Sequence, residues 1–348
     1  MSKMNHLQRI AAAITHQKPD RVPVVAVTIS RSLKEAGYSL KEVVHDASKI
    51  AEAKIAAHEK YGDDGIVASL DLYVEPEALG AKTELREHVP IVTEHPLAKD
   101  KDFSRLVKPT LKDGRFPVVL EEVKLLKEKY GDEVCIGPVT GGPITTSANL
   151  RGVENLLMDM VLDPSYVHEL LRLCTDVCLD YYRAICEAGA HAIIMLDPVS
   201  TNTIMSPEQY QEFTMPYQKE LFAVCAEHSV VGVNHICADT SLIWEKMINV
   251  GAPAIQIDFP IDLEDCKKRV GPETCIMGNV NPIETMLYGN PDDVYNAAVK
   301  CIKAAGNQSG FVLTPGCDLN PKTPEENIKA LVQAAKDCAY DDDGNVQF

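Results

Sequence analysis

The chain has 348 residues, of which 45% are hydrophobic, and its formal net charge is −17. This length and composition suit a single α/β barrel with a large core. The acidic charge argues against a nucleic-acid partner, because phosphate contacts need clustered Lys and Arg. No apolar run reaches the length of a membrane span, and the N-terminal stretch lacks the apolar core of a signal peptide. We therefore expect a cytoplasmic protein without membrane insertion.

Short apolar runs alternate with longer amphipathic runs along the chain. These short runs are rich in β-branched residues and lack period-two alternation, which is typical of parallel strands buried on both faces. The expected strands cover residues 22–28, 65–70, 134–140, 192–197, 230–237, 254–259, 274–280 and 310–317.

The segments between the strands are less regular in the first third of the chain than later. Residues 75–102 resemble a hairpin or an inserted excursion. Later, residues 206–228 predict a helix capped by Ser206, and residues 290–307 predict a helix capped by Asn290. Eight β/α units without a linker predict a (β/α)₈ TIM barrel, a single domain over residues 1–348 with an irregular N-terminal third. An open doubly wound sheet is the alternative.

In such barrels the active-site residues lie at the carboxyl ends of the strands and in the loops that follow. The residues that end the expected strands here form a polar set. They are Asp71, Thr140, Asp197, His235, Cys237, Asp258, Asn279 and Cys317.

A metal site is the sharpest chemical prediction from this set. His235 and Cys237 in "NHICAD" are two residues apart on a strand, so their side chains project to the same side. Cys317 in "TPGCDL" ends another strand. Two thiolates and an imidazole match Zn²⁺, and three protein ligands leave the open fourth position of a catalytic site. The alternative is that the histidine is an ordinary hydrogen-bonded pocket residue.

Other polar residues near the strand ends have two interpretations each. Asp197 either orders an incoming substrate or is a carboxylate at a helix entry. Asp71 and Glu75 are candidates to line the pocket, and one of the two could fill the open zinc position. Asn279 either hydrogen-bonds substrate or closes its own turn. Asp239 either orients the histidine ligand or caps the helix that follows.

Several stretches of the chain resemble one family. "NHICAD" and the later "TPGCDL" are similar to the His-x-Cys…Cys zinc signature of the methylcobamide:coenzyme M methyltransferases, which belong to the uroporphyrinogen decarboxylase superfamily. "HQKPDRVPVV" resembles the opening of that superfamily, and "LDLYVEPEALGA" resembles its Asp-bearing segment. "GNVNPIETMLYGNPDDV" resembles the region near its seventh strand, and "GCDLNPKTPEENIKALV" its closing helix. The likeness covers nearly the whole chain and implies the same barrel.

The resemblance implies an enzyme that moves a methyl group from a methylated corrinoid protein to a zinc-bound thiolate, with coenzyme M as the expected acceptor. His235, Cys237 and Cys317 match the zinc ligands of that family. The chain lacks the DxHxxG cobalamin signature. We therefore expect methylcobalamin to be supplied by a small corrinoid protein as partner.

Three alternatives to this function stay open. The same zinc site could serve another acceptor, such as a different small thiol or tetrahydrofolate, or could demethylate a growth substrate. A second alternative is a non-catalytic zinc barrel that binds a corrinoid protein. The third is uroporphyrinogen decarboxylase, whose aspartate matches Asp71. This chain has Arg31 but lacks the arginine-rich Trp-Met-Arg-Gln-Ala-Gly-Arg run that binds the carboxylates of its substrate.

Overall fold

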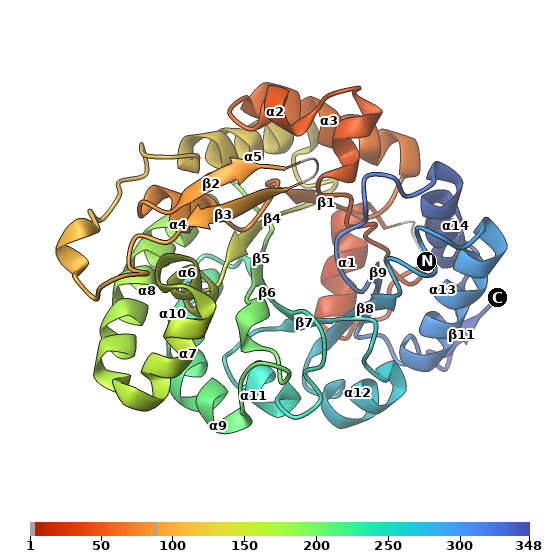
Figure 1. Ribbon diagram of the computed structural model, residues 1–348. Coiled ribbons are helices and arrows are strands. Elements are labelled where there is room, and N and C mark those ends of the chain that lie inside the picture. Colours follow the sequence, from red (N-terminus) through yellow and green to blue (C-terminus); the bar gives the residue numbers. More distant parts are fainter. Residues whose placement is uncertain (1–3, 87–88) are drawn as a thin grey trace.

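A curled parallel sheet forms the centre of the computed structural model, which describes residues 4–86 and 89–348. Its seven strands follow the order β1-β4-β5-β6-β7-β8-β9, and Figure 1 shows helices outside them. The strands are β1 (Gly65–Ala68), β4 (Cys135–Gly141), β5 (Ala192–Leu196), β6 (Val231–Ile236), β7 (Ala254–Ile257), β8 (Cys275–Val280) and β9 (Phe311–Pro315). Because all neighbours are parallel, the carboxyl ends of the strands meet at one edge.

The interior of the sheet is filled by side chains, as in a barrel. Buried residues from all seven strands and from residues 22–28 form one apolar cluster there. Ile10 and Ile14 of the first helix belong to the same cluster, at the end of the barrel where that helix lies. Larger apolar clusters lie between the strands and the outer helices. The predicted barrel fold is therefore confirmed, with the site expected at the opposite end from the first helix.

One predicted strand, residues 22–28, is not a regular strand. Only an isolated parallel bridge joins Val24 to Leu313 of β9, and the Leu313 amide donates to the carbonyl of Pro23 at 2.9 Å. Two features explain the interruption. Pro23 has no N–H to donate, and Val27 has a φ of 50°, in the left-handed region that strands do not use.

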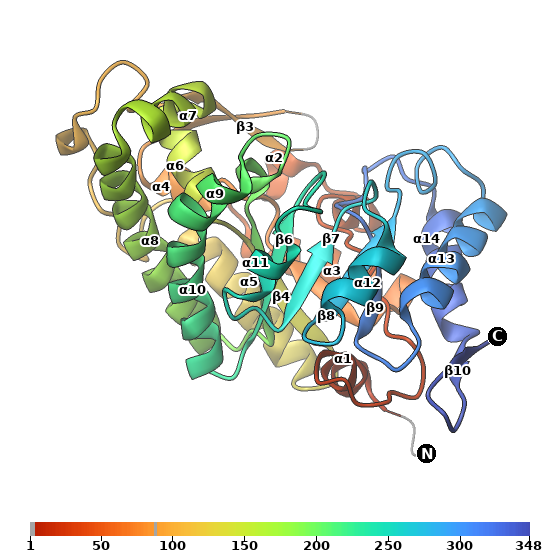
Figure 2. The same ribbon diagram turned by 90° about the horizontal axis from the view of Figure 1, so that it is seen from below.

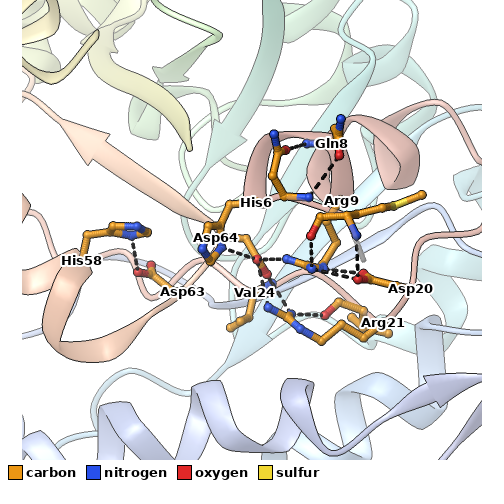
Figure 3. Close-up of polar contacts among 12 residues, drawn as sticks. His6, Gln8, Arg9, Asp20, Arg21, Val24, His58, Asp63 and Asp64 are labelled. Carbon is orange, nitrogen blue, oxygen red and sulfur yellow. Dashed lines mark hydrogen bonds and ion pairs between the residues drawn. The ribbon is translucent and has the colours of Figure 1, made fainter. Parts of the chain in front are cut away.

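A buried carboxylate holds this irregular segment in place. The Oδ2 atom of Asp64 accepts from the Val24 amide at 2.9 Å, and the Asp64 amide donates back to the Val24 carbonyl at 2.7 Å. The guanidinium groups of Arg9 and Arg21 and the imidazole of His6 also contact this carboxylate (Figure 3). Asp64 directly precedes β1, so residues 22–28 lie between β9 and the start of β1 and complete the barrel.

The helices cover the outside of the sheet and one end of it. Figure 2 shows α1 at one end of the barrel and α7 with the β2–β3 hairpin at the other. The helices are α1 (His6–Ile14), α2 (Leu40–Val43), α3 (Ala47–Tyr61), α4 (Val74–Ala78), α5 (Phe116–Tyr130), α6 (Pro143–Arg151), α7 (Val153–Leu162), α8 (Pro164–Glu187), α9 (Pro207–Gln209), α10 (Met215–Glu227), α11 (Trp244–Ile248), α12 (Leu263–Val270), α13 (Pro291–Ala305) and α14 (Glu325–Lys336), with 3₁₀ turns η1 (Arg31–Glu35), η2 (Phe103–Arg105) and η3 (Pro198–Ser200). Within the described ranges, no helix is both long and apolar enough to cross a membrane.

The two helices predicted from their caps are both present, one of them interrupted. Asn290 forms a capping box at the start of α13, as predicted. Ser206 also forms a capping box, but the expected helix is divided into α9, the π-helical turn η4 (Tyr210–Thr214) and α10. Pro216 lies just after the division and has no N–H for the preceding turn, which explains why the regular ladder changes there.

The irregular N-terminal third contains the predicted hairpin. Strands β2 (Lys82–Leu85) and β3 (Pro90–Glu94) pair antiparallel, and residues 87 and 88 between them lie outside the described part. A second small antiparallel pair, β10 (Ala339–Tyr340) and β11 (Val346–Gln347), follows α14.

Candidate functional site

The three predicted metal ligands converge at the carboxyl end of the barrel. His235 lies near the end of β6, Cys237 follows that strand, and Cys317 follows β9. The Nε2 atom of His235 lies 3.2 Å from the Cys237 sulfur, and the sulfurs of Cys237 and Cys317 are 3.8 Å apart. One ligand atom from each residue lies within 4.8 Å of the others. Residues distant in sequence thus form one compact donor set.

The imidazole of His235 is oriented by its neighbour strand. Its Nδ1 atom lies 3.1 Å from the backbone carbonyl of Gln256, which pairs with His235 across β6 and β7. A carbonyl oxygen only accepts, so Nδ1 carries the proton and Nε2 presents a free lone pair toward the two sulfurs. This is the tautomer that a metal at Nε2 requires.

The spacing of the donors fits tetrahedral zinc. With Zn–S bonds of about 2.3 Å, two cysteinates on a tetrahedron have sulfurs about 3.8 Å apart. The observed 3.8 Å between Cys237 and Cys317 agrees with that edge. In the absence of a cation, contact with Cys237 and burial raise the pKa of the Cys317 thiol well above its ordinary value. A bound divalent cation reverses that preference and deprotonates coordinating thiols.

A cavity of about 310 Å³ reaches these three residues from the barrel mouth. Its walls are largely apolar, formed by side chains such as Leu70, Val139 and Leu196, while Val89 and Ile283 stand exposed beside its opening. The donor set therefore lies in a mostly apolar pocket that is open to a small molecule from the barrel mouth.

Asp71 is among the residues that line this cavity, and its carboxylate is already paired. Its two oxygens accept from the two terminal nitrogens of Arg115 at 2.7 and 2.9 Å, and one also accepts from the Tyr73 amide. Arg115 in turn contacts Glu77 through Nε at 2.8 Å. The carboxylate is thus held in a bidentate pair.

Glu75 lies outside the cavity, fully buried between α4 and β4. One oxygen accepts from the Gly141 amide at 3.1 Å, and the other has no hydrogen-bond partner among the residues that the structure describes. Burial raises the pKa of Glu75 to about 8, so its carboxyl is largely protonated at neutral pH.

Asp197 is also fully buried and does not line the cavity. Its carboxylate accepts from the Thr145 amide at 2.9 Å, in the first turn of α6, and from the Gln218 side chain at 3.0 Å. A Cβ on Gly142 would lie 2.2 Å from its carboxyl carbon, so only glycine leaves room for this contact. Burial raises the pKa of Asp197 to about 6. These contacts match the helix-entry interpretation of this residue.

Asn279 is the next-to-last residue of β8, and its side chain contacts other residues than the donor set. Its side-chain nitrogen donates to the carbonyls of Asp258 and Ile261 at 3.1 and 2.9 Å, and its oxygen faces the Cys301 thiol. Both amide protons are therefore used within the protein. Asn279 does not line the cavity that holds the donor set.

His235 is not oriented by Asp239. One Asp239 oxygen accepts from the Ser241 amide at 2.9 Å, whereas the Gln256 carbonyl holds His235. Arg115 and Gln256 were missed as functional residues. A polar Gln256 within the apolar run "AIQI" was the available signal; Arg115, far from any strand end, offered none.

Comparison with known proteins places the chain in a family. Residues 5–338 match the family model described as uroporphyrinogen decarboxylase (URO-D). The chain belongs to the uroporphyrinogen decarboxylase family. It is 32% identical to the methylcobamide:CoM methyltransferase MtaA of Methanosarcina barkeri, over 98% of this chain and all of that protein. It is also similar to a uroporphyrinogen decarboxylase of Chlorobaculum tepidum, 28% identical over 82% of this chain and 83% of the decarboxylase.

A solved structure resembles the chain along nearly its whole length. A methyltransferase from Methanosarcina mazei has a TM-score of 0.88 and 29% identity, and the match covers 96% of this chain and 98% of that one. The family predicted from the sequence motifs and the prediction of a methyltransferase are thereby confirmed.

Proposed function

We propose that this methyltransferase moves a methyl group from a methylated corrinoid to the sulfur of coenzyme M at a zinc site formed by His235, Cys237 and Cys317. The observation that carries the proposal is the convergence of two thiols and one imidazole within 4.8 Å at the end of the cavity. The relatives named methylcobamide:CoM methyltransferases support the donor and the acceptor.

The protein's own residues account for the environment that this reaction needs. The Gln256 carbonyl fixes the imidazole tautomer, and the apolar walls exclude water from a thiolate waiting for the methyl group. Zinc, when bound, supplies the positive charge that lowers the pKa of an incoming thiol at the open fourth position. An acceptor thiol that releases its proton to solvent there would be the nucleophile: its sulfur would bond to the methyl carbon as the methyl–cobalt bond breaks, and the electron pair of that bond would stay on cobalt.

The size of the cavity supports a corrinoid carried by a partner protein. A corrinoid ring is far larger than a cavity of about 310 Å³, whereas a thiol of a few heavy atoms fits inside. The corrinoid ring therefore stays outside the cavity and presents its methyl group at the mouth, where a partner protein that carries the ring can dock. A small corrinoid protein is the partner we propose.

The contacts of Arg31 and Arg115 argue against decarboxylation of a polycarboxylate porphyrinogen. Arg31 is buried, contacts Glu35, and donates through Nε to the Thr323 carbonyl at 3.1 Å. Arg115 is held by Asp71 and Glu77. Neither guanidinium is free to bind a substrate carboxylate, and Asp71 is not free to contact a pyrrole.

The test is an anaerobic assay of free methylcobalamin with coenzyme M, followed by the visible spectrum, beside a measurement of zinc per chain. We expect loss of the methylcobalamin band with the wild-type chain and one zinc per chain. Cys317→Ala should abolish the reaction and lower the zinc content. Cys186→Ala, which removes a half-buried thiol on α8, is the matched control and should behave as wild type.

Each other outcome has a distinct meaning. One zinc per chain with no reaction toward coenzyme M would contradict the acceptor, and repeating the assay with other thiols and tetrahydrofolate would then identify the right one. If the protein is purified in a buffer that contains zinc and still holds no zinc, the metal site itself is contradicted.

A further inference from the structure

Strand β7 supplies no ligand, yet it lies between the strands that do. The sheet order places β7 and β8 between β6, which carries His235 and leads to Cys237, and β9, which leads to Cys317. The distance between the two cysteines therefore depends on whatever spans that gap. Two polar residues, Gln256 in β7 and Asp258 directly after it, contact both sides.

Asp258 holds the loop that carries Cys237. Its carboxylate is buried, with 6% of the residue exposed, and Oδ2 accepts from the amide of Ala238 at 2.8 Å. Ala238 directly follows Cys237 and has a φ of 63°, a left-handed conformation that is unfavourable for alanine. The hydrogen bond stabilises that backbone turn and so fixes the direction of the Cys237 side chain.

The other oxygen of Asp258 faces the loop that carries Cys317. Oδ1 accepts from the Phe259 amide at 2.7 Å. A Cβ added to Gly316 would lie 2.7 Å from this oxygen and 2.6 Å from the Phe259 nitrogen. Glycine before Cys317 thus permits close packing of the second ligand loop against the Asp258 carboxylate.

Two neighbours keep this arrangement rigid. Asn279 donates to the Asp258 carbonyl at 3.1 Å and so fixes the backbone from the β8 side. The Gln256 side chain donates to the Pro315 carbonyl at 3.3 Å, while its backbone carbonyl orients His235. Gln256 and Asp258 therefore contact His235 itself, the residue after Cys237, and the loop before Cys317.

We infer that Asp258 is a positioning residue, which sets the spacing of Cys237 and Cys317 by holding Ala238 on one side and packing on Gly316 on the other. The inference rests on the proposed zinc site and adds a residue that is not itself one of the three ligands. It also gives Asn279 a role in the site through Asp258.

The experiment measures zinc affinity by competition with a chromophoric chelator, and the sulfur-to-metal charge-transfer bands of the Co²⁺-substituted protein. Asp258→Ala should bind zinc about 10- to 100-fold more weakly than wild type, as removal of other outer partners of metal ligands does. Its cobalt bands should shift, because the sulfur positions change. Asp258→Asn keeps the volume and one acceptor oxygen, and should lose less affinity.

Two further variants make the test specific. Gly316→Ala should shift the cobalt bands in the same way, because its new methyl group displaces the Asp258 carboxylate. Asp262→Ala is the matched control. Asp262 lies four residues after Asp258, is exposed, and caps the start of α12 by accepting from the Asp265 amide. It should change stability slightly and leave the zinc affinity and the cobalt bands unchanged.

The outcomes separate this inference from the function on which it rests. If wild type binds zinc and Asp258→Ala and Gly316→Ala match it within twofold with unchanged cobalt bands, the inference is wrong and the zinc site stands. If the wild-type chain binds no zinc, the proposed site fails and the inference with it. The inference is supported if Asp258→Ala and Gly316→Ala bind zinc more weakly than wild type and have shifted cobalt bands, while Asp262→Ala matches wild type in both measurements.

Discussion

Buried carboxyl groups lie next to the site without facing its cavity. Glu75 and Asp197 flank the turn between β4 and α6, and each accepts from a backbone amide there, those of Gly141 and Thr145. Burial raises the pKa of both, to about 8 and about 6. Such groups hold loop backbone in place, and because their charged forms are poorly solvated they make stability depend on pH.

Glu75→Gln should change how stability varies with pH. Glu75 in the folded chain keeps its proton up to a pH of about 8, whereas in the unfolded chain it loses the proton near its ordinary value of 4.5. The free energy of unfolding of the wild type therefore falls as pH rises through that window. Glutamine mimics the protonated form, so the variant should lose less stability, the difference reaching a few kcal/mol.

The measurement is urea unfolding of both chains at pH 5, 6.5 and 8, with the same zinc content. Glu84→Gln, on the exposed strand β2, is the control and should parallel wild type. Equal pH dependence in wild type and Glu75→Gln would show that Glu75 ionises normally in the folded state.

At the scale of single residues, the sequence indicated which residue types gather at the strand ends, but it did not indicate the hydrogen-bond partners of the carboxylates. His235, Cys237 and Cys317 were grouped correctly because parallel strand ends must meet at one edge, and soft donors stand out there. The carboxylates could not be placed in the same way. Their partners are Arg115, directly before α5, for Asp71 and Gln218, within α10, for Asp197. No local sequence pattern specifies how these helices are placed and rotated against the sheet.

Among the elements, the segment 22–28 stands apart because side chains replace much of its strand ladder. Asp64 accepts from the Val24 amide, and Asp63 accepts from the Ala26 amide at 2.9 Å. The expected strand was recognised from its apolar residues. Its irregularity could not be predicted, because it depends on the backbone of Val27 and on two carboxylates that lie 40 and 37 residues farther along the chain than the amides they bind.

Asp64→Asn should weaken the closure of the barrel. It leaves the buried Arg9 and the half-buried Arg21 without their shared carboxylate, and loss of such a buried partner typically costs about 3–5 kcal/mol of unfolding free energy. The pKa of Asp64 is lowered to about 2, net of burial, by its contacts with His6, Arg21 and Arg9. The carboxylate therefore stabilises the fold above pH 4, and this contribution is lost as pH falls through about 2.

Hydrogen exchange followed by mass spectrometry locates the effect, beside urea unfolding at pH 7. Exchange should accelerate in residues 22–28 and in β9, which pair with each other. Asp132→Asn serves as comparison, since this exposed carboxylate also forms ion pairs, with Lys127 and His191. A loss of stability no greater than that of Asp132→Asn would refute the closing role of Asp64.

Across the whole molecule, the proposed zinc connects β6 to β9 through metal–ligand bonds, in addition to the backbone hydrogen bonds of the sheet. A ligand that binds only the folded chain adds about 2.7 kcal/mol of stability at a concentration one hundred times its Kd. We expect chelation to lower the Tm of the wild type by several degrees, whereas Cys237→Ser should have the lower Tm already and should not respond to the chelator. A wild-type Tm indifferent to chelation would contradict the linkage.

The sequence separation of the ligands has a consequence for synthesis. Cys237 and Cys317 are 80 residues apart, and the third ligand follows the last strand of the sheet. While the ribosome is still translating β7 and β8, the nascent chain offers a cation only His235 and Cys237, too few donors for tight binding. On the proposed function, firm retention of zinc begins only when β9 has docked, and a chain released before that point holds no zinc. The zinc content of the protein in the cell would then report how many chains had completed the barrel.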